Sequence, residues 1–149
     1  MKFKISVSDE KYSELEAFLK DHGIEISEEA EYEITERKGS SEFLSVRNEK
    51  KERISLSTAE IVFIEAFGKD IEIHTMQDTF YSSDRMYQIE ALLDAKEFIR
   101  ISKSVIISRG HVKKIRPTLS MKFVLTLTNG VQVDVTRSYY AEFKKFYNI

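Results

Sequence analysis

The segment KFVLTLTNGVQVDVT, residues 122–136, constrains the fold more than any other stretch of the chain. Apolar and polar residues alternate on both sides of Asn129-Gly130, as in two strands that each bury one face. The Asn-Gly pair is typical of a type I′ turn, which needs a positive φ at both central residues. The sequence therefore predicts a β-hairpin whose arms have matching apolar faces, formed by Phe123, Leu125, Leu127, Val131, Val133 and Val135.

Further short strands are predicted from Phe43 onward, where segments rich in β-branched and aromatic residues are separated by turn or charged residues. These segments are FLSV, ISLS, IVFIEAF, DIEIHTM, TFYS, FIRIS, VIIS and HVKKIRP. A helical period interrupts them over residues 86–93, with Ser83 or Asp84 as its N-cap. A last helix is predicted within residues 137–149, with its aromatic residues packed inward.

Residues 1–42 predict a small β-α-β segment. KFKISV alternates at period two, and Ser8 is the expected N-cap of a helix with an apolar stripe. That stripe consists of Tyr12, Leu15, Phe18 and Leu19. The stretch KGSSE, residues 38–42, is the most linker-like part of the chain. We therefore predict a mainly β protein with short helices (α+β overall), in which layered antiparallel β-sheets over residues 43–149 follow the small segment.

The composition favours a soluble cytoplasmic protein. Hydrophobic residues make up 42% of the 149 residues, which is enough for a core, and the absence of cysteine excludes disulfides. The N-terminus lacks the apolar region of a signal peptide, and no apolar run approaches the roughly 20 residues that span a bilayer. We therefore expect no membrane insertion.

Charge is unevenly distributed along the chain, although the net charge is only −2. Residues 1–38 carry 6 Lys/Arg against 11 Asp/Glu, whereas residues 95–149 carry 11 against 3. A positive field over the C-terminal part attracts phosphates.

No enzyme signature is found in the sequence. The five glycines form no phosphate-binding loop, and none of His22, His74 and His111 has a second ligand at metal spacing. Glu65 and Asp134 have no acid–base partner nearby in the sequence. We expect no catalysis, no cofactor and no metal.

The segment FIRISKSVIIS, residues 98–108, places cations and hydroxyls beside apolar residues. Ile99 and Ile101 can face a core along a strand. The polar residues among them are Arg100, Ser102, Lys103 and Ser104. Taken alone, these residues are either an ordinary solvated strand or a polar turn that faces an anionic partner.

Three motifs, in a fixed order along the chain, indicate a resemblance to a known protein family. They are IEAFG at residues 64–68, FIRISKS at residues 98–104, and an NG hairpin that ends in Thr-Arg at residues 136–137. Together they resemble the LytTR family of bacterial DNA-binding domains, whose pattern is IEA-x-G, then F-x-R-x-x-x-S, then an NG or DG hairpin with a Ser/Thr-Arg step. The resemblance covers residues 43–149.

The resemblance implies a transcription regulator in which layered β-sheets, and not a recognition helix, present loops to the major grooves of double-stranded DNA. Matched by position, Lys69, Lys103 and Arg137 approach the bases. Arg137 can pair with guanine in bidentate fashion, and lysine can approach the same acceptors. The other matched residues support a turn or touch phosphate, namely Arg100, Ser104, Ser138 and Tyr139. Ser138 is also expected to begin the last helix, where free backbone amides favour an anion.

Two positions depart from the family pattern. Many relatives carry asparagine in place of Ser108. Many also have an aromatic residue near Asp70, and an acid there is repelled by phosphate.

The resemblance also bears on partners. The chain is similar to members without a receiver domain, some of which are encoded beside a small membrane protein that restrains them. We expect two copies, a homodimer at least on DNA, on a direct or inverted promoter repeat. Residues 1–42 could dimerise, bind such a partner or cover a sheet edge, and these alternatives stay open.

Two other functions fit the residues less well. The chain could be a protein-interaction module with little affinity for DNA. It could also be a small-molecule sensor with a pocket between the helix at residues 86–93 and the sheet.

Overall fold

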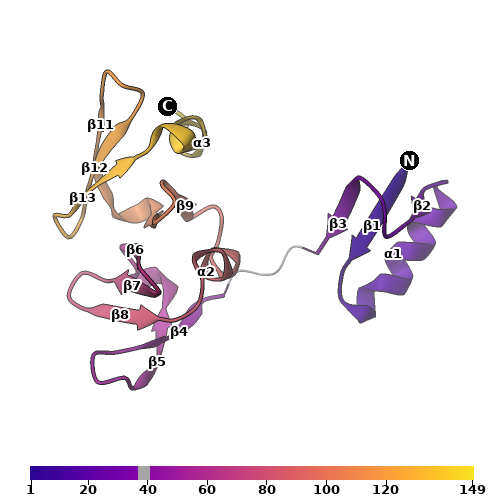
Figure 1. The fold of residues 1–149 in the computed structure, drawn as a ribbon, viewed down its shortest axis with the longest axis horizontal. Coiled ribbons are helices and arrows are strands. Elements are labelled where there is room, and N and C mark those ends of the chain that lie inside the picture. The colour runs from indigo at the N-terminus through magenta and orange to yellow at the C-terminus, as the bar shows by residue number, and fades with distance from the viewer. Residues whose placement is uncertain (37–40) are drawn as a thin grey trace. The chain divides into compact units, whose positions relative to one another are not determined.

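Figure 1 shows the chain as a computed structural model, which describes residues 1–36 and 41–149. The chain divides into an N-terminal unit, residues 1–38, and a C-terminal unit, residues 39–149. The predicted linker-like stretch at 38–42 lies partly outside the described residues. No helix in the part of the chain that the structure describes has the length and apolar character needed to cross a bilayer.

The N-terminal unit is a parallel three-stranded sheet with one crossover helix (Figure 1), as the β-α-β pattern predicted. β1 (Lys2–Ser6) lies between β2 (Glu25–Ile26) and β3 (Tyr32–Thr35), and α1 (Asp9–Asp21) connects β1 to β2. Ile5 and Leu19 are buried between sheet and helix. The predicted apolar stripe was wrong at Phe18, which is 57% exposed.

The start of α1 is held by an ion pair instead of by the predicted serine cap. Ser8 occupies the N-cap position, but its side chain makes no capping hydrogen bond. The Glu36 carboxylate accepts the Ser8 backbone N–H at 3.3 Å and lies 2.7 Å from the Lys11 ammonium. The hydrogen bond between the two side chains raises the pKa of Lys11 and lowers the pKa of Glu36. The contact therefore fastens the residue after β3 to the first turn of α1.

The C-terminal unit contains two antiparallel sheets, as predicted. The first has seven strands in the order β5-β4-β8-β7-β6-β10-β9, and the second has three in the order β11-β12-β13. The strands of the first sheet are β4 (Phe43–Arg47), β5 (Arg53–Ser57), β6 (Phe63–Phe67), β7 (Asp70–His74), β8 (Thr79–Ser82), β9 (Phe98–Arg100) and β10 (Val105–Ser108). Those of the second are β11 (Val112–Pro117), β12 (Phe123–Leu127) and β13 (Gln132–Val135). The helices are α2 (Met86–Leu92) and α3 (Tyr140–Tyr147), and short 3₁₀ turns lie at 58–60, 109–111 and 137–139.

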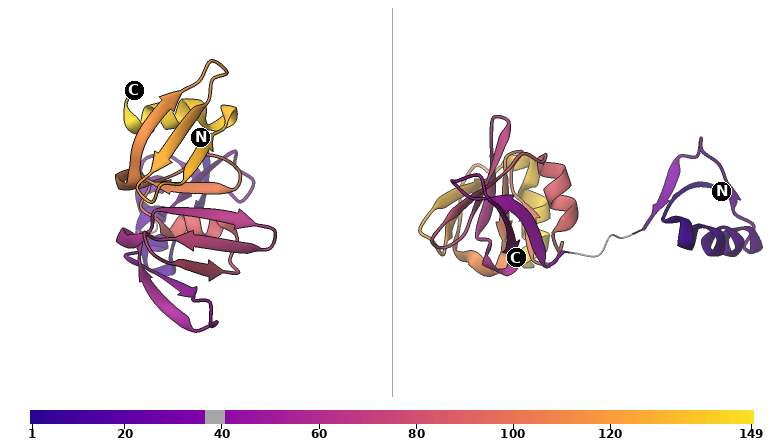
Figure 2. Two further views of the ribbon diagram at one scale, coloured as in Figure 1. Left: turned by 90° about the vertical axis from the view of Figure 1, so that its left-hand side faces the viewer. Right: turned by 90° about the horizontal axis from the view of Figure 1, so that it is seen from below.

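The seven-stranded sheet is buried on both faces along β6 and β10. Ile64 and Ile106 belong to a core shared with α2. Phe63, Val105 and Ile107 belong to a second core shared with the three-stranded sheet and α3. The left view in Figure 2 shows the three-stranded sheet and α3, in orange to yellow, together on one side of the seven-stranded sheet. Because alternate residues of a strand point to opposite faces, one pair of strands supplies both cores.

Aromatic contacts fix α3 against the second core. Phe143 is fully buried and lies 5.1 Å from the ring of Phe123. The Tyr147 hydroxyl donates a hydrogen bond to the Arg109 carbonyl at 3.0 Å. Burial raises the pKa of Tyr147 to about 12, although the nearby Arg109 charge opposes this shift. The predicted inward packing of this helix is therefore confirmed for Tyr140, Phe143 and Tyr147, whereas Phe146 is not part of the second core.

Two local predictions were wrong. The N-cap of α2 is Arg85, not Ser83 or Asp84, and the Gln88 side chain accepts the Arg85 N–H at 2.9 Å. The β12–β13 turn is not type I′, because Gly130 has a φ of 86° whereas Asn129 does not have a positive φ. Asn129 instead accepts the Val131 N–H through its side-chain oxygen at 3.2 Å.

Gly130 offers a test of this turn, since a Cβ there would meet no atom within 4 Å and only the backbone conformation matters. Gly130→Ala should lower the free energy of unfolding by about 1 kcal/mol, because L-residues are disfavoured at positive φ. The control is Gly110→Ala, a position with equally open space and no positive φ, which should change the value by less than about 0.5 kcal/mol. Equal effects in urea titrations would contradict the assigned turn.

Candidate nucleic-acid interface

The β6–β7 turn places one cation at the end of the seven-stranded sheet. Phe67 pairs with Asp70, so Gly68 and Lys69 form a two-residue turn. Gly68 has a φ of 55°, as a type II′ turn requires at its first central position. The Lys69 side chain is exposed at the tip of this turn.

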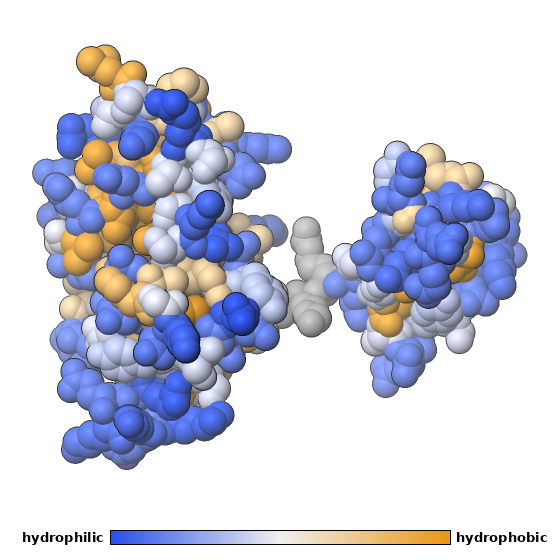
Figure 3. Space-filling view, viewed as in Figure 1, coloured by the Kyte–Doolittle hydropathy of each residue, from blue (hydrophilic) through white to orange (hydrophobic). Residues whose placement is uncertain are grey.

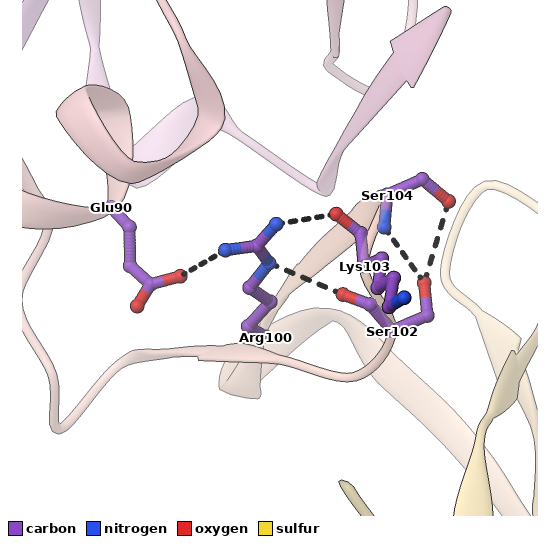
Figure 4. Close-up of polar contacts among 5 residues, drawn as sticks. All are labelled: Glu90, Arg100, Ser102, Lys103 and Ser104. Carbon is purple, nitrogen blue, oxygen red and sulfur yellow. Dashed lines mark hydrogen bonds and ion pairs between the residues drawn. The ribbon is translucent and has the colours of Figure 1, made fainter. Parts of the chain in front are cut away.

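The β9–β10 turn, residues 102–104, holds a second exposed cation, Lys103. The Arg100 guanidinium donates hydrogen bonds to the carbonyls of Ser102, at 3.2 Å, and of Lys103. Figure 4 shows this guanidinium between the turn and Glu90, whose carboxylate lies 3.7 Å away. The hydroxyl of Ser102 also accepts the Ser104 N–H at 3.3 Å. Arg100 therefore holds the backbone that carries Lys103.

Arg137 follows β13 and begins the 3₁₀ turn at 137–139. The preceding residue, Thr136, donates its N–H to the Ile101 carbonyl at 3.0 Å, and its hydroxyl reaches the same oxygen at 3.4 Å. This anchor places Arg137 beside the start of the β9–β10 turn. The Arg137 side chain is exposed.

The three exposed cations share one end of the C-terminal unit. The Ala66 N–H donates to the Ser104 carbonyl at 2.8 Å, which joins the end of β6 to the β9–β10 turn. The Thr136 contact joins that turn to the exit of β13. We call the surface formed by Lys69, Lys103 and Arg137 the basic end.

The remaining predicted residues lie on or near the basic end. Ser104 and Tyr139 are half-buried, and Tyr139 packs against the second core. Ser138 is exposed but does not begin α3, which starts at Tyr140, so that prediction was wrong. Ser138 instead lies inside the 3₁₀ turn, because a short tighter turn precedes the α-helix.

Sequence reasoning missed two residues near Lys69. A hollow at this end is lined by Gly68, Lys69, Asp70, Ser83 and Arg85, among others. The segment that carries Ser83 and Arg85 reaches this end because β8 runs antiparallel to β7, with Ser82 opposite Ile71. Only the strand pairing reveals this proximity, since nothing in the local sequence marks it.

The two departures from the family pattern have different surroundings. Asp70 also lines a neighbouring hollow with Arg47, Lys51 and Tyr81. The acid Glu49 lines the same hollow, so the surroundings of Asp70 carry charges of both signs. Ser108 is 8% exposed, and its N–H donates to the Val62 carbonyl at 3.1 Å.

Most of the space between α2 and the sheet is filled by side chains, and the predicted pocket is open at the side of the helix next to β9. Met86, Ile89 and Leu93 are buried directly against the sheet. This open part is a groove of about 470 Å³ between α2, β9 and α3. Its lining includes Phe98 and Arg100.

Comparison with known families gives a direct match: the family model described as the LytTr DNA-binding domain matches residues 51–148. The chain belongs to the LytTR family. A solved structure, the LytTr DNA-binding domain of a methyl-accepting/DNA response regulator from Bacillus cereus, aligns with a TM-score of 0.69. The alignment covers 74% of this chain and 100% of that one, and at 24% identity it shows the fold alone.

Curated relatives of this LytTR chain are longer bacterial proteins. The sensory transduction protein LytT of Bacillus subtilis is 25% identical over 96 residues, which are 64% of this chain and 40% of the relative. The transcriptional regulatory protein LytR of Staphylococcus aureus is 33% identical over 72 residues, 48% of this chain and 29% of the relative. The chain thus spans less than half the length of these relatives.

Arg100 gives a testable prediction for the turn that carries Lys103. Arg100→Met should lower the free energy of unfolding by about 1–2 kcal/mol, because two backbone carbonyls lose a charged donor. Amide exchange at 102–104 should accelerate. The control Glu90→Gln should cost less than about 1 kcal/mol, since exposed ion pairs contribute little. Unchanged exchange in Arg100→Met would show that the guanidinium does not hold the turn.

Proposed function

We propose that the chain is a sequence-specific transcription regulator that binds double-stranded DNA in the bacterial cytoplasm through the basic end. The observation that carries this proposal is the placement of Lys69, Lys103 and Arg137. Three separate segments of sequence bring exposed cations to one end of a rigid β scaffold, and backbone hydrogen bonds of 2.8 and 3.0 Å connect them. Membership of a family described as a DNA-binding domain supports the same conclusion.

Base recognition on this proposal comes from side chains in the major groove. The forked guanidinium of Arg137 can donate two hydrogen bonds to guanine O6 and N7. The compact ammonium group of Lys103 can bind similar acceptors. Contacts to the phosphate backbone come from Ser104, Ser138 and Tyr139, which fix the position of the protein without reading sequence. Arg100 keeps its structural role in the β9–β10 turn. Because phosphate contacts dominate affinity, binding should fall steeply with salt.

Two copies are proposed to bind a repeat-containing promoter, as a homodimer at least on DNA. The N-terminal segment, predicted as residues 1–42, is proposed to join the two copies or to bind a regulatory partner such as a small membrane protein.

A second candidate function is protein interaction through the N-terminal unit, with little DNA affinity. β3 is an edge strand of its sheet, and Tyr32 on this strand is 56% exposed. An exposed edge strand can pair with another chain. A gel-shift experiment with DNA from upstream of the protein's own gene separates the two functions. A protein that only binds other proteins should not retard this DNA, even at low salt.

Arg137→Ala is the direct test of base reading. It should weaken binding to the cognate duplex by about 1–3 kcal/mol and relax the preference at one base position. The matched control is Lys50→Ala, an exposed cation in the β4–β5 turn, which should leave affinity unchanged. A variant that binds as tightly and selectively as the parent would show that Arg137 does not read a base.

A further inference from the structure

The β11–β12 hairpin ends in a tip, residues 118–122 (TLSMK), that exposes two apolar side chains. Leu119 has a relative exposure of 108%, and Met121 is 56% exposed. Figure 3 shows hydrophobic side chains, in orange, projecting at the top of the C-terminal unit, where this hairpin ends in Figure 1. Water-exposed leucine is common singly, but here two large apolar residues project from one turn.

The tip is well ordered by its own hydrogen bonds. The Thr118 N–H and hydroxyl both donate to the Lys122 carbonyl, at 2.9 and 3.0 Å. The Thr118 hydroxyl also lies 3.2 Å from that of Ser120. Met121 has a φ of 57°, a left-handed conformation that residues with a Cβ rarely adopt. The backbone of the turn thus has a defined conformation that leaves the side chains of Leu119 and Met121 exposed.

Strand register places the tip on the same side as the basic end. Phe123, the first residue after the tip, pairs with Val135. From Val135 the chain continues through Thr136 to Arg137, so the tip extends past the strand end from which Arg137 emerges. The tip and Arg137 therefore lie at the same end of the three-stranded sheet, although Lys122 and Arg137 are far apart in the sequence.

Cations predominate along β11 and in the tip, and Asp134 of β13, opposite Val124, is the acid in the row next to this end of the sheet. Residues 98–133 contain 7 Lys/Arg and no Asp or Glu. Register puts Ile115 beside Leu125 of the second core, so its neighbours Lys114 and Arg116 point to the opposite, outward face of β11. Lys122 is exposed in the tip itself. An apolar tip among mainly positive charges is suited to a polyanion that also has apolar sugar surfaces.

We infer that the β11–β12 tip is an additional DNA contact, outside the loops that approach the bases. Lys122 binds a phosphate next to the groove that Arg137 enters, while Leu119 and Met121 pack against the sugars and base edges of the adjoining minor groove. Apolar side chains of minor-groove binders make contacts of this kind. The inference rests on the proposed function and extends the DNA site by about half a helical turn, or about five base pairs, on one flank.

The test uses the full chain and the duplex footprinted upstream of its own gene. The double variant Leu119→Ser, Met121→Ser should bind roughly tenfold more weakly, because the apolar surface is no longer buried. Lys122→Gln should lower the slope of log K against log salt by about 0.9. Removing about five base pairs from the contacted flank should weaken binding by the parent more than binding by the double variant, which keeps only the Lys122 contact there. Lys50→Gln is the control, and thermal melting checks that every variant is folded.

The outcomes separate the tip from the proposed function. A parent that retards no DNA overturns both. A parent that binds, with tip variants of equal affinity, salt slope and flank dependence, overturns only the tip contact. Loss of binding by the double variant on two-site DNA alone would assign the tip to contact between protein copies. If the tip variants lose only binding to anionic phosphatidylserine vesicles, the tip contacts lipid instead of DNA.

Discussion

The whole C-terminal unit depends on one constraint, the burial of β6 and β10 on both faces. Ile64 and Ile106 belong to the core with α2, whereas Phe63, Val105 and Ile107 belong to the core with the three-stranded sheet and α3. This pair of strands therefore joins two cores into one rigid body. At one end the same strands lead into the turns that carry Lys69 and Lys103. Rigidity of the scaffold fixes the spacing of the exposed cations, which sequence-specific recognition needs.

Hydrogen bonds hold the surface turns in place beyond the two cores. The Arg100 guanidinium donates hydrogen bonds to two carbonyls of its own turn. It therefore stabilises the turn, while the Lys103 side chain stays exposed. The Thr136–Ile101 hydrogen bond holds the exit of β13 against that turn. The two parts of the molecule that would read different bases are thus joined by backbone, and not only by long side chains. A surface built in this way loses little conformational entropy when it binds.

Much of the fold could be predicted because alternation and period are local. The pairings of Phe123 with Val135 and of Leu125 with Val133 follow from the β12–β13 pattern alone. The type of turn did not follow, since the Asn129 side chain bonds to the backbone without a positive φ. The predicted burial of Phe18 was wrong because a unit of this size has too little interior to bury every apolar residue of its helix. For the candidate site, motifs could indicate Lys69, Lys103 and Arg137, but Arg85 and the β11–β12 tip join them only through pairing between distant strands.

The central claim is that this one end of the β scaffold is the surface that meets DNA. Backbone amide shifts of the full chain, followed by NMR while cognate duplex is added, test it most directly. The account predicts that the largest changes fall at residues 67–70, 101–104, 118–122 and 136–139, with small changes in β4, β5 and the N-terminal unit. Changes concentrated in those latter elements, with the four segments unaffected, would contradict it.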